Sequence, residues 1–274
     1  MIRPWLFALL FLALTSLSLS AQDAKMGFEQ PIGNNNVVQT PEQLRRVPPP
    51  SKDATASELE VQADALRAQK NYADAGDYYR AAIRKHDSAV VENKLGIVEL
   101  QSLHLDDAKQ RFERSIHLDK AYPDAHNNLG VVFYVKHNYG RAIKEYNKAI
   151  QERPDSSSFH SNLGSALFAK KEYEKASVEY TTAMQIDPDI FTRQSTVGVQ
   201  AKLGSPEDRA LFHYTIARVF AKRGDNDNCL LYLRKAIEDG FPSIDDVYKE
   251  AAFSGILKDP RFVTLMASKP EAVK

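Results

Sequence analysis

The stretch NNLGVVFYVKHNYGRAIKEYNKAIQERP, residues 127–154, decides the fold through the places where it keeps small side chains. Gly130, Ala142 and Ala149 stand where a soluble helix could carry larger residues, and aromatic residues such as Tyr146 fall between them. A chain keeps small residues at such points when a second helix lies too close for anything bigger. The stretch therefore predicts two closely packed helices.

The same pattern recurs along the chain with a nearly constant period. Positions 161–188, SNLGSALFAKKEYEKASVEYTTAMQIDP, align with the stretch and place Gly164 on Gly130. Positions 94–120, KLGIVELQSLHLDDAKQRFERSIHLDK, align with it from the other side and place Gly96 on Gly130. One further step back reaches a copy that starts near position 56. The aromatic column of the four copies contains Tyr79, Phe112, Tyr146 and Tyr180. Repetition of this kind indicates a stack of similar units.

Each unit reads as a pair of helices. Apolar and small residues follow helical spacing in two stretches, which a short turn such as 137–138 or 171–172 separates. Ala142, Tyr146 and Ala149 are spaced four and three residues apart and so form one inward stripe. Pro154 marks the exit of the second helix, because proline cannot continue a helix interior.

These columns resemble the tetratricopeptide repeat, a helix-turn-helix unit of about 34 residues with the pattern W-x2-L-G-x2-Y, A-x3-F and P. The resemblance covers four units in residues 56–188. His126 and His160 depart from the pattern in the tryptophan column, and the first two units carry Asp87 and Lys120 in place of the last proline. The resemblance implies an all-α fold, a right-handed superhelical solenoid of such repeats with a C-terminal helical cap.

The remainder of the folded part divides into three segments. Residues 205–241 predict a fifth, degenerate unit, in which Cys229 and Ala236 occupy expected columns. Residues 189–204 separate it from the fourth unit and read as an inserted loop, because they carry glycines and no amphipathic period. Residues 242–274 predict short helices that cap the apolar end of the array.

The N-terminal residues 1–20 have the pattern of an export signal, since Arg3 precedes an apolar run and small residues follow. We expect cleavage after Ser20 or Ala21 and therefore an exported protein, periplasmic or secreted, with membrane attachment only if the signal stays uncleaved. Residues 21–55, rich in proline and asparagine, predict a disordered linker. Its three consecutive prolines, 48–50, read either as a spacer or as a polyproline ligand for a partner.

Composition narrows the classes of function. Lysine plus arginine and aspartate plus glutamate number 36 each, so no net field favours nucleic acid or anionic lipid. The single cysteine, Cys229, excludes an internal disulfide framework and argues against a cysteine-bound metal; we expect it to be buried.

No catalytic motif is apparent. The sequence lacks a glycine-rich phosphate loop, HExxH and a nucleophile elbow, so we expect no enzyme activity, cofactor, metal or small-molecule substrate. His126, His160 and His213 share one column, but stacked helices place equivalent side chains about 10 Å apart, too far for shared coordination. We interpret them as packing residues. A hydrolase or transferase site in the insertion would have Ser195 and Thr196 without a histidine or acid beside them.

The resemblance implies a concave groove lined by the first helix of each unit, and with it a scaffold that binds a peptide segment of an exported or envelope protein. The residues it places on the groove are Asn93, Ile97, Leu100 and Gln101 in the second unit, Asn127, Val131, Tyr134 and Val135 in the third, and Ser161, Ser165 and Phe168 in the fourth. A clamp for a C-terminal carboxylate would use lysine and arginine beside asparagine. The matching column offers Asn128 and Asn162, but Asn93, Ile97 and Ser158 stand where the basic side chains would be needed, so a clamp is disfavoured.

Two other interpretations stay open. The apolar patch of the groove could be covered by the chain's own linker or insertion. The array could also be a structural or self-associating component of an envelope assembly that recognises no peptide.

Overall fold

The computed structural model describes residues 47–192 and 206–268, which belong to one compact unit that extends over 45–274. The export signal, the linker up to residue 46 and positions 193–205 of the insertion and its border lie outside the described residues. The described part is helical throughout and contains no strand, which confirms the all-α prediction. None of its helices combines the length and apolar character needed to cross a membrane.

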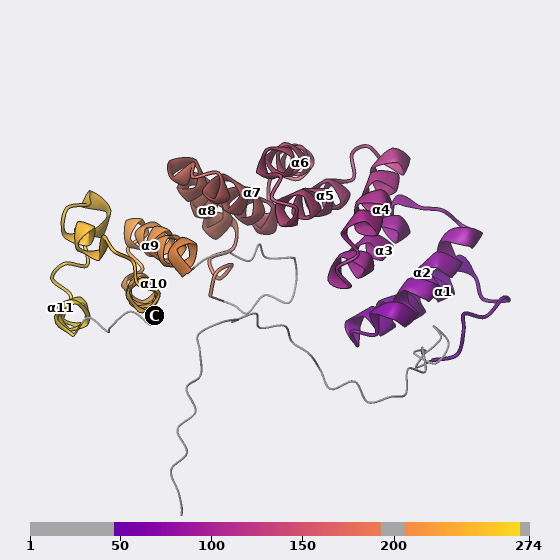
Figure 1. Ribbon diagram of the computed structural model, residues 1–274, viewed down its shortest axis with the longest axis horizontal. Helices are drawn as coiled ribbons and strands as arrows, with labels where there is room; N and C mark the ends of the chain where they lie inside the picture. The colour runs from indigo at the N-terminus through magenta and orange to yellow at the C-terminus, as the bar shows by residue number, and fades with distance from the viewer. Residues whose placement is uncertain (1–46, 193–205, 269–274) are drawn as a thin grey trace, which may run out of the picture. The chain divides into compact units, whose positions relative to one another are not determined.

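Ten of the helices form five pairs that follow one another along the chain (Figure 1). Each helix packs on its partner, and α2 on α3, α4 on α5, and α6 on α7 join consecutive pairs. The helices are α1 (Ala56–Ala68), α2 (Tyr72–Lys85), α3 (Ala89–Gln101), α4 (Leu105–Leu118), α5 (Pro123–Val135), α6 (Tyr139–Glu152), α7 (Ser157–Ala169), α8 (Tyr173–Ile186), α9 (Pro206–Lys222) and α10 (Asn226–Glu238).

The small residues are explained by what lies against them. A Cβ atom added to Gly96 would lie 2.5 Å from the ring of Phe112, and one added to Gly164 would lie 2.6 Å from the ring of Tyr180. The glycine of each first helix thus receives the aromatic ring of the second helix. The sequence predicted a neighbouring backbone at this point, and the structure corrects this to a neighbouring ring.

The alanines of the second helices behave as predicted. Ala142, Ala149 and Ala176 have no exposed surface and lie in the interior of their pairs. Because a larger side chain there would have to displace the facing helix, alanine at these columns fixes how closely the two helices approach.

Each of the five turns between paired helices contains one residue in the left-handed region. These residues are Lys70, Leu103, His137 and Lys171, with φ between 57° and 64°, and Gly224, with φ of 73°. The turn between α3 and α4 shows the hydrogen bonding that this conformation permits, with the amide of His104 donating to the carbonyl of Glu99 at 2.8 Å. Only the fifth turn uses glycine, the residue that adopts this conformation without strain.

The last residues of the predicted linker belong to the folded unit. The hydroxyl of Tyr78 donates to the carbonyl of Pro48 at 3.0 Å, and Lys85 Nζ donates to the carbonyl of Lys52 at 2.8 Å. Val47 and Ala54 pack against the core of the first pairs. The linker boundary at residue 55 is therefore corrected: residues 47–55 run over α2, and irregular backbone of this kind leaves no periodic signal in a sequence.

The segment after α10 forms three short helical elements over the end of the array. They are the 3-10 helices η1 (Ile244–Tyr248) and η2 (Ala251–Phe253) and the helix α11 (Pro260–Ala267). Val247, Phe253 and Phe262 are buried and continue the core that Cys229 and Leu233 of α10 begin.

Candidate functional site

The residues predicted to line the groove all lie on α3, α5 and α7, the first helices of three consecutive pairs. Gln101 and Val135 are exposed, and Ile97 and Ser165 are half-buried. The other predicted positions are buried: Asn93, Leu100, Asn127, Val131, Tyr134, Ser161 and Phe168.

The apolar part of the predicted groove already has contacts within the chain. Val131 and Phe168 are each 2% exposed. The ring of Phe168 meets the ring of Tyr173 at 5.1 Å and that of Phe212 from α9 at 6.0 Å between centroids. Phe191, in the described part of the insertion, packs against Phe212 at 6.3 Å. A partner reaches such side chains only by displacing what covers them, so the apolar patch stays a prediction.

A row of asparagine amides connects the same three helices. Asn162 Nδ2 of α7 donates to Asn127 Oδ1 of α5 at 2.9 Å. Asn127 Nδ2 donates to Asn128 Oδ1 at 3.1 Å, and Asn128 Nδ2 donates to Asn93 Oδ1 of α3 at 2.9 Å. We call Asn93, Asn127, Asn128 and Asn162 the asparagine relay. Each amide donates to the next in the same direction, from α7 to α3, across three consecutive pairs. Asn128 is half-buried, and the other three asparagines are buried.

The sequence pointed to only part of this relay. Asn93 and Asn127 were predicted as groove residues, whereas Asn128 and Asn162 were considered only as clamp positions. The bonds that cross between pairs join positions 35 apart, which is one step more than the repeat period. The signal that could have shown them is an asparagine in each of two adjacent columns.

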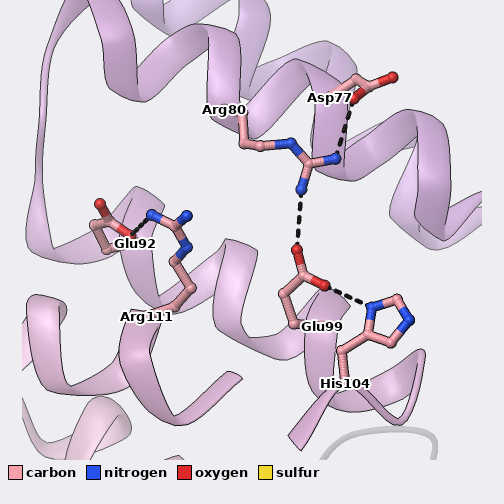
Figure 2. Close-up of polar contacts among 6 residues, drawn as sticks. All are labelled: Asp77, Arg80, Glu92, Glu99, His104 and Arg111. Atoms are coloured by element: carbon pink, nitrogen blue, oxygen red, sulfur yellow. Dashed lines mark hydrogen bonds and ion pairs between the residues drawn. The ribbon is translucent and has the colours of Figure 1, made fainter. Parts of the chain in front are cut away.

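A second polar feature lies inside the pairs, where a residue of the first helix contacts the residue 19 positions later. Glu92 Oε2 lies 3.3 Å from Arg111 Nη1 (Figure 2), and His126 Nδ1 lies 2.8 Å from Glu145 Oε2. The equivalent distance in the next pair, from His160 Nδ1 to Glu179 Oε2, is 2.7 Å. Burial raises the pKa of Glu92, and the charge of Arg111 opposes this shift. Each histidine thus has its own carboxylate, in place of the tryptophan contacts of the repeat pattern.

The described residues bring together one group with metal-ligand chemistry, Glu99, His104 and Asp107, whose donor atoms lie within 4.8 Å of one another. Figure 2 shows why we assign no metal to it. Arg80 Nη1 donates to Glu99 Oε1 at 2.9 Å, and Glu99 Oε2 lies 2.9 Å from His104 Nδ1. A guanidinium so close to the central ligand repels a cation, so the group is a polar contact between α2 and the turn after α3.

Comparison with known proteins agrees with the geometry. No curated protein matches the chain. Among solved structures, pilF of Pseudomonas aeruginosa is similar, with 17% identity, a TM-score of 0.51, and 80% of this chain and 84% of that chain covered. MamA from Desulfovibrio magneticus RS-1 is 14% identical and has a TM-score of 0.49. The match covers 69% of this chain and 96% of that chain.

A third solved structure is YrrB, described as a tetratricopeptide-repeat protein with an unusual peptide-binding site. It is 16% identical and has a TM-score of 0.46, and the match covers 71% of this chain and 91% of that chain. At these identities the likenesses concern the fold alone. A family model of the tetratricopeptide repeat matches residues 93–157 and 136–189, which contain α4 to α8. The repeat columns and the paired helices agree with this match, which supports a tetratricopeptide-repeat protein.

Proposed function

We propose that the chain is a non-enzymatic scaffold that binds an extended segment of another protein along the first helices α3, α5 and α7. A tetratricopeptide-repeat fold is typical of scaffolds for protein–protein interaction. The observation that carries the finer proposal is the asparagine relay, because it aligns amide groups along one line of three consecutive pairs.

An asparagine row suits a peptide main chain for a chemical reason. Each amide offers two N–H donors and an oxygen with two lone pairs, which match the donors and acceptors of an extended backbone. The amides of the relay are joined by hydrogen bonds of 2.9–3.1 Å, so they form one continuous polar row that an extended chain can follow. Such binding depends little on the partner's side chains.

The relay leaves part of its hydrogen-bonding capacity for a ligand. Among the described contacts, Asn127 and Asn128 each donate one amide hydrogen and accept one, so each keeps a second donor and a second lone pair. Gln101 and Val135, which end α3 and α5, are exposed on the same first helices. The balanced charge of the chain, 36 basic and 36 acidic residues, favours a neutral or mixed partner over a polyanion.

The partner is proposed to be an exported or envelope protein. The support is the export-signal pattern of residues 1–20, with Arg3 before the apolar run. N-terminal sequencing of the protein recovered from cell envelope and medium tests this step. A mature chain that starts at residue 21 or 22 is expected, and a chain that starts at Met1 in the cytoplasmic fraction would contradict it.

Site-specific photo-crosslinking tests the binding surface. A photoreactive residue at Gln101 or Val135 should capture a defined partner in the native compartment, whereas one at Val178 on the second helix α8, which is 62% exposed, should not. Asn128→Ala should abolish the capture. Asn147→Ala, which changes an exposed asparagine on the second helix α6, is the matched control and should leave it unchanged.

Three outcomes would contradict the proposal. They are equal capture from Val178, undiminished capture by the N128A variant at an unchanged melting temperature, and capture of only a second copy of this chain. The last outcome would favour the structural role, and a concentration series by analytical ultracentrifugation would then show self-association.

A further inference from the structure

The segment 47–52, which we call the strap, is held on α2 by hydrogen bonds to its main chain. The hydroxyl of Tyr78 donates to the carbonyl of Pro48 at 3.0 Å, and Nζ of Lys85 donates to the carbonyl of Lys52 at 2.8 Å. Tyr78 is 8% exposed, so its hydroxyl has a fixed place on the helix. Because both acceptors are backbone oxygens, these contacts depend on the path of the strap more than on its side chains.

The spacing of the two donors fits an extended segment. Tyr78 and Lys85 lie seven positions apart on α2, so they leave the same face of the helix, about 10.5 Å apart along its axis. Pro48 and Lys52 lie four positions apart, which is about 12 Å in a polyproline II segment. Two turns of the helix therefore match four residues of such a segment.

The proline run 48–50 favours this conformation. Proline fixes its own φ near −65° and pushes the residue before it into an extended conformation. A polyproline II segment has no internal hydrogen bonds, so its carbonyls are open to outside donors. Pro48 and Pro49 are exposed, so α2 does not enclose their rings. The prolines therefore act by stiffening the strap, which lowers the entropy lost when it docks.

Both ends of the strap are anchored. At its start, Val47 packs against the core that α1, α2 and α3 share. After it, the amide of Asp53 donates to Ser51 Oγ at 3.2 Å in a turn. Thr55 then caps α1, since its Oγ1 accepts from the amide of Glu58 at 3.2 Å. The strap thus has a defined length between the core and the first helix.

A later pair holds its incoming segment at the equivalent place. In the third pair, the carbonyl oxygen of Lys120 lies 3.1 Å from His126 Nε2, and His126 Nδ1 lies 2.8 Å from Glu145 Oε2. Tyr78 occupies the column of Glu145, and Leu59 occupies the column of His126. Leucine offers no polar group, and the tyrosine hydroxyl reaches the incoming carbonyl directly. The contact with the strap is therefore the first pair's form of a contact that recurs in the array.

We propose that Tyr78 and Lys85 form a docking site on α2 for an extended proline-rich segment, and that the strap of the same chain occupies it. The proline run is then bound within the chain and serves neither as a free spacer nor as a ligand for another protein. The docked strap completes the first helix pair. This inference does not depend on the proposed binding function, which involves α3, α5 and α7.

Tryptic cleavage after Lys52 in the full chain, followed by mass spectrometry, measures the docking, because the protease reaches this bond when the strap leaves α2. Tyr78→Phe removes only the hydroxyl group and should speed this cleavage by about 2- to 10-fold, the factor expected for one lost hydrogen bond. Tyr180→Phe removes a tyrosine hydroxyl from α8 and is the matched control, which should cleave at the wild-type rate. Equal rates for Y78F and the wild type would overturn the proposal.

The contribution of the proline run is tested with the same cleavage. Pro49→Ala keeps both hydrogen-bonded carbonyls but makes the strap more flexible, so cleavage after Lys52 should be about 2- to 5-fold faster. An unchanged rate would contradict the role of the prolines. Protection of Lys52 that falls on dilution of the wild type would assign the strap to a second copy of the chain, which would contradict docking within one chain.

A labelled peptide with the strap sequence VPPPSK tests whether the site is filled. It should bind the full-length triple variant Pro48→Gly, Pro49→Gly and Pro50→Gly in fluorescence anisotropy, because that variant holds its own strap weakly. The wild type, whose site is occupied, should bind it much less. Equal binding to both chains, or binding to neither while circular dichroism shows both folded, would overturn the proposal.

Discussion

The ring of Tyr146 lies so close to Gly130 that a Cβ atom added to the glycine would stand 2.6 Å from the ring carbon Cε1. The tyrosine is fully buried, so its ring cannot swing out into solvent without leaving the core. The glycine column of the repeat therefore exists because a large ring in the second helix fills the place of the missing side chain.

Gly130→Ala is expected to destabilise the fold by about 0.5–2 kcal/mol. Alanine favours a helix over glycine by about 1 kcal/mol, but forcing a methyl group into a packed core costs about 1–3 kcal/mol. Chemical denaturation followed by circular dichroism measures the balance.

Gly140→Ala is the matched control, because Gly140 lies in the first turn of α6 and a Cβ there would meet no atom within 4 Å. This variant should be as stable as the wild type or more stable by up to about 1 kcal/mol. Equal effects of the two substitutions would show that the ring does not limit the glycine column.

The repeat period predicted the helix pairs and the two columns, but it could not show which columns touch. Gly130 and Tyr146 were both singled out, yet the sequence predicted only that a second helix lies close to the glycine, not that the ring covers it. A period reports which face of a helix points inward. The side chain that covers a given position depends on the offset between two helices, which the period does not contain.

The candidate site shows the same limit in another form. Asn127 was found by comparing columns one repeat period apart, but its bond to Asn162 joins positions 35 apart and so crosses between columns. Phe168 also contacts Phe212 of the fifth pair, which an insertion separates from the regular repeats. Contacts that cross columns or insertions are set by packing in three dimensions.

Leu103→Gly is expected to stabilise the protein by about 0.5–1 kcal/mol. Leu103 has φ of 64° in the turn between α3 and α4 and is 78% exposed, so it loses little packing when shortened. A non-glycine residue in the left-handed region costs about 1–2 kcal/mol, which exceeds the entropic cost of glycine. The midpoint of urea denaturation should rise.

The reverse change tests the same reasoning. Gly224 has φ of 73°, and an added Cβ would meet no atom within 4 Å, so Gly224→Ala introduces backbone strain without a steric clash. Its denaturation midpoint should fall by the equivalent of about 1 kcal/mol. A lower midpoint for L103G, or an unchanged one for G224A, would contradict the role of the left-handed turn residue.

Tyr79→Phe should cost about 1–2 kcal/mol of stability, clearly more than Tyr180→Phe. Both rings are fully buried in the same column, so the two variants remove only a hydroxyl group. The hydroxyl of Tyr79 donates to Asp64 Oδ1 at 2.5 Å, whereas that of Tyr180 lies 3.5 Å from Ser165 Oγ, the limit of a hydrogen bond. A bond to a charged acceptor contributes more than one between hydroxyl groups. Equal losses in thermal or chemical denaturation would show that the column's hydroxyl groups do not differ.

His213 should lower the stability of the fold as the solution becomes acidic. Burial lowers the pKa of its ring, although the bond from Nδ1 to Asp239 Oδ2 at 2.7 Å and the charge of Asp239 oppose the shift; Lys235 and Arg209 add to it. The unfolded ring then binds a proton at higher pH than the folded ring. The contribution of His213 to the free energy of unfolding is present above about pH 6.5 and is lost as pH falls below that value. His213→Gln should therefore reduce the loss of stability between pH 6.5 and 5 relative to the wild type, measured as unfolding free energy at each pH. A steeper acid loss in the variant would show that the folded ring holds its proton more tightly than the unfolded one.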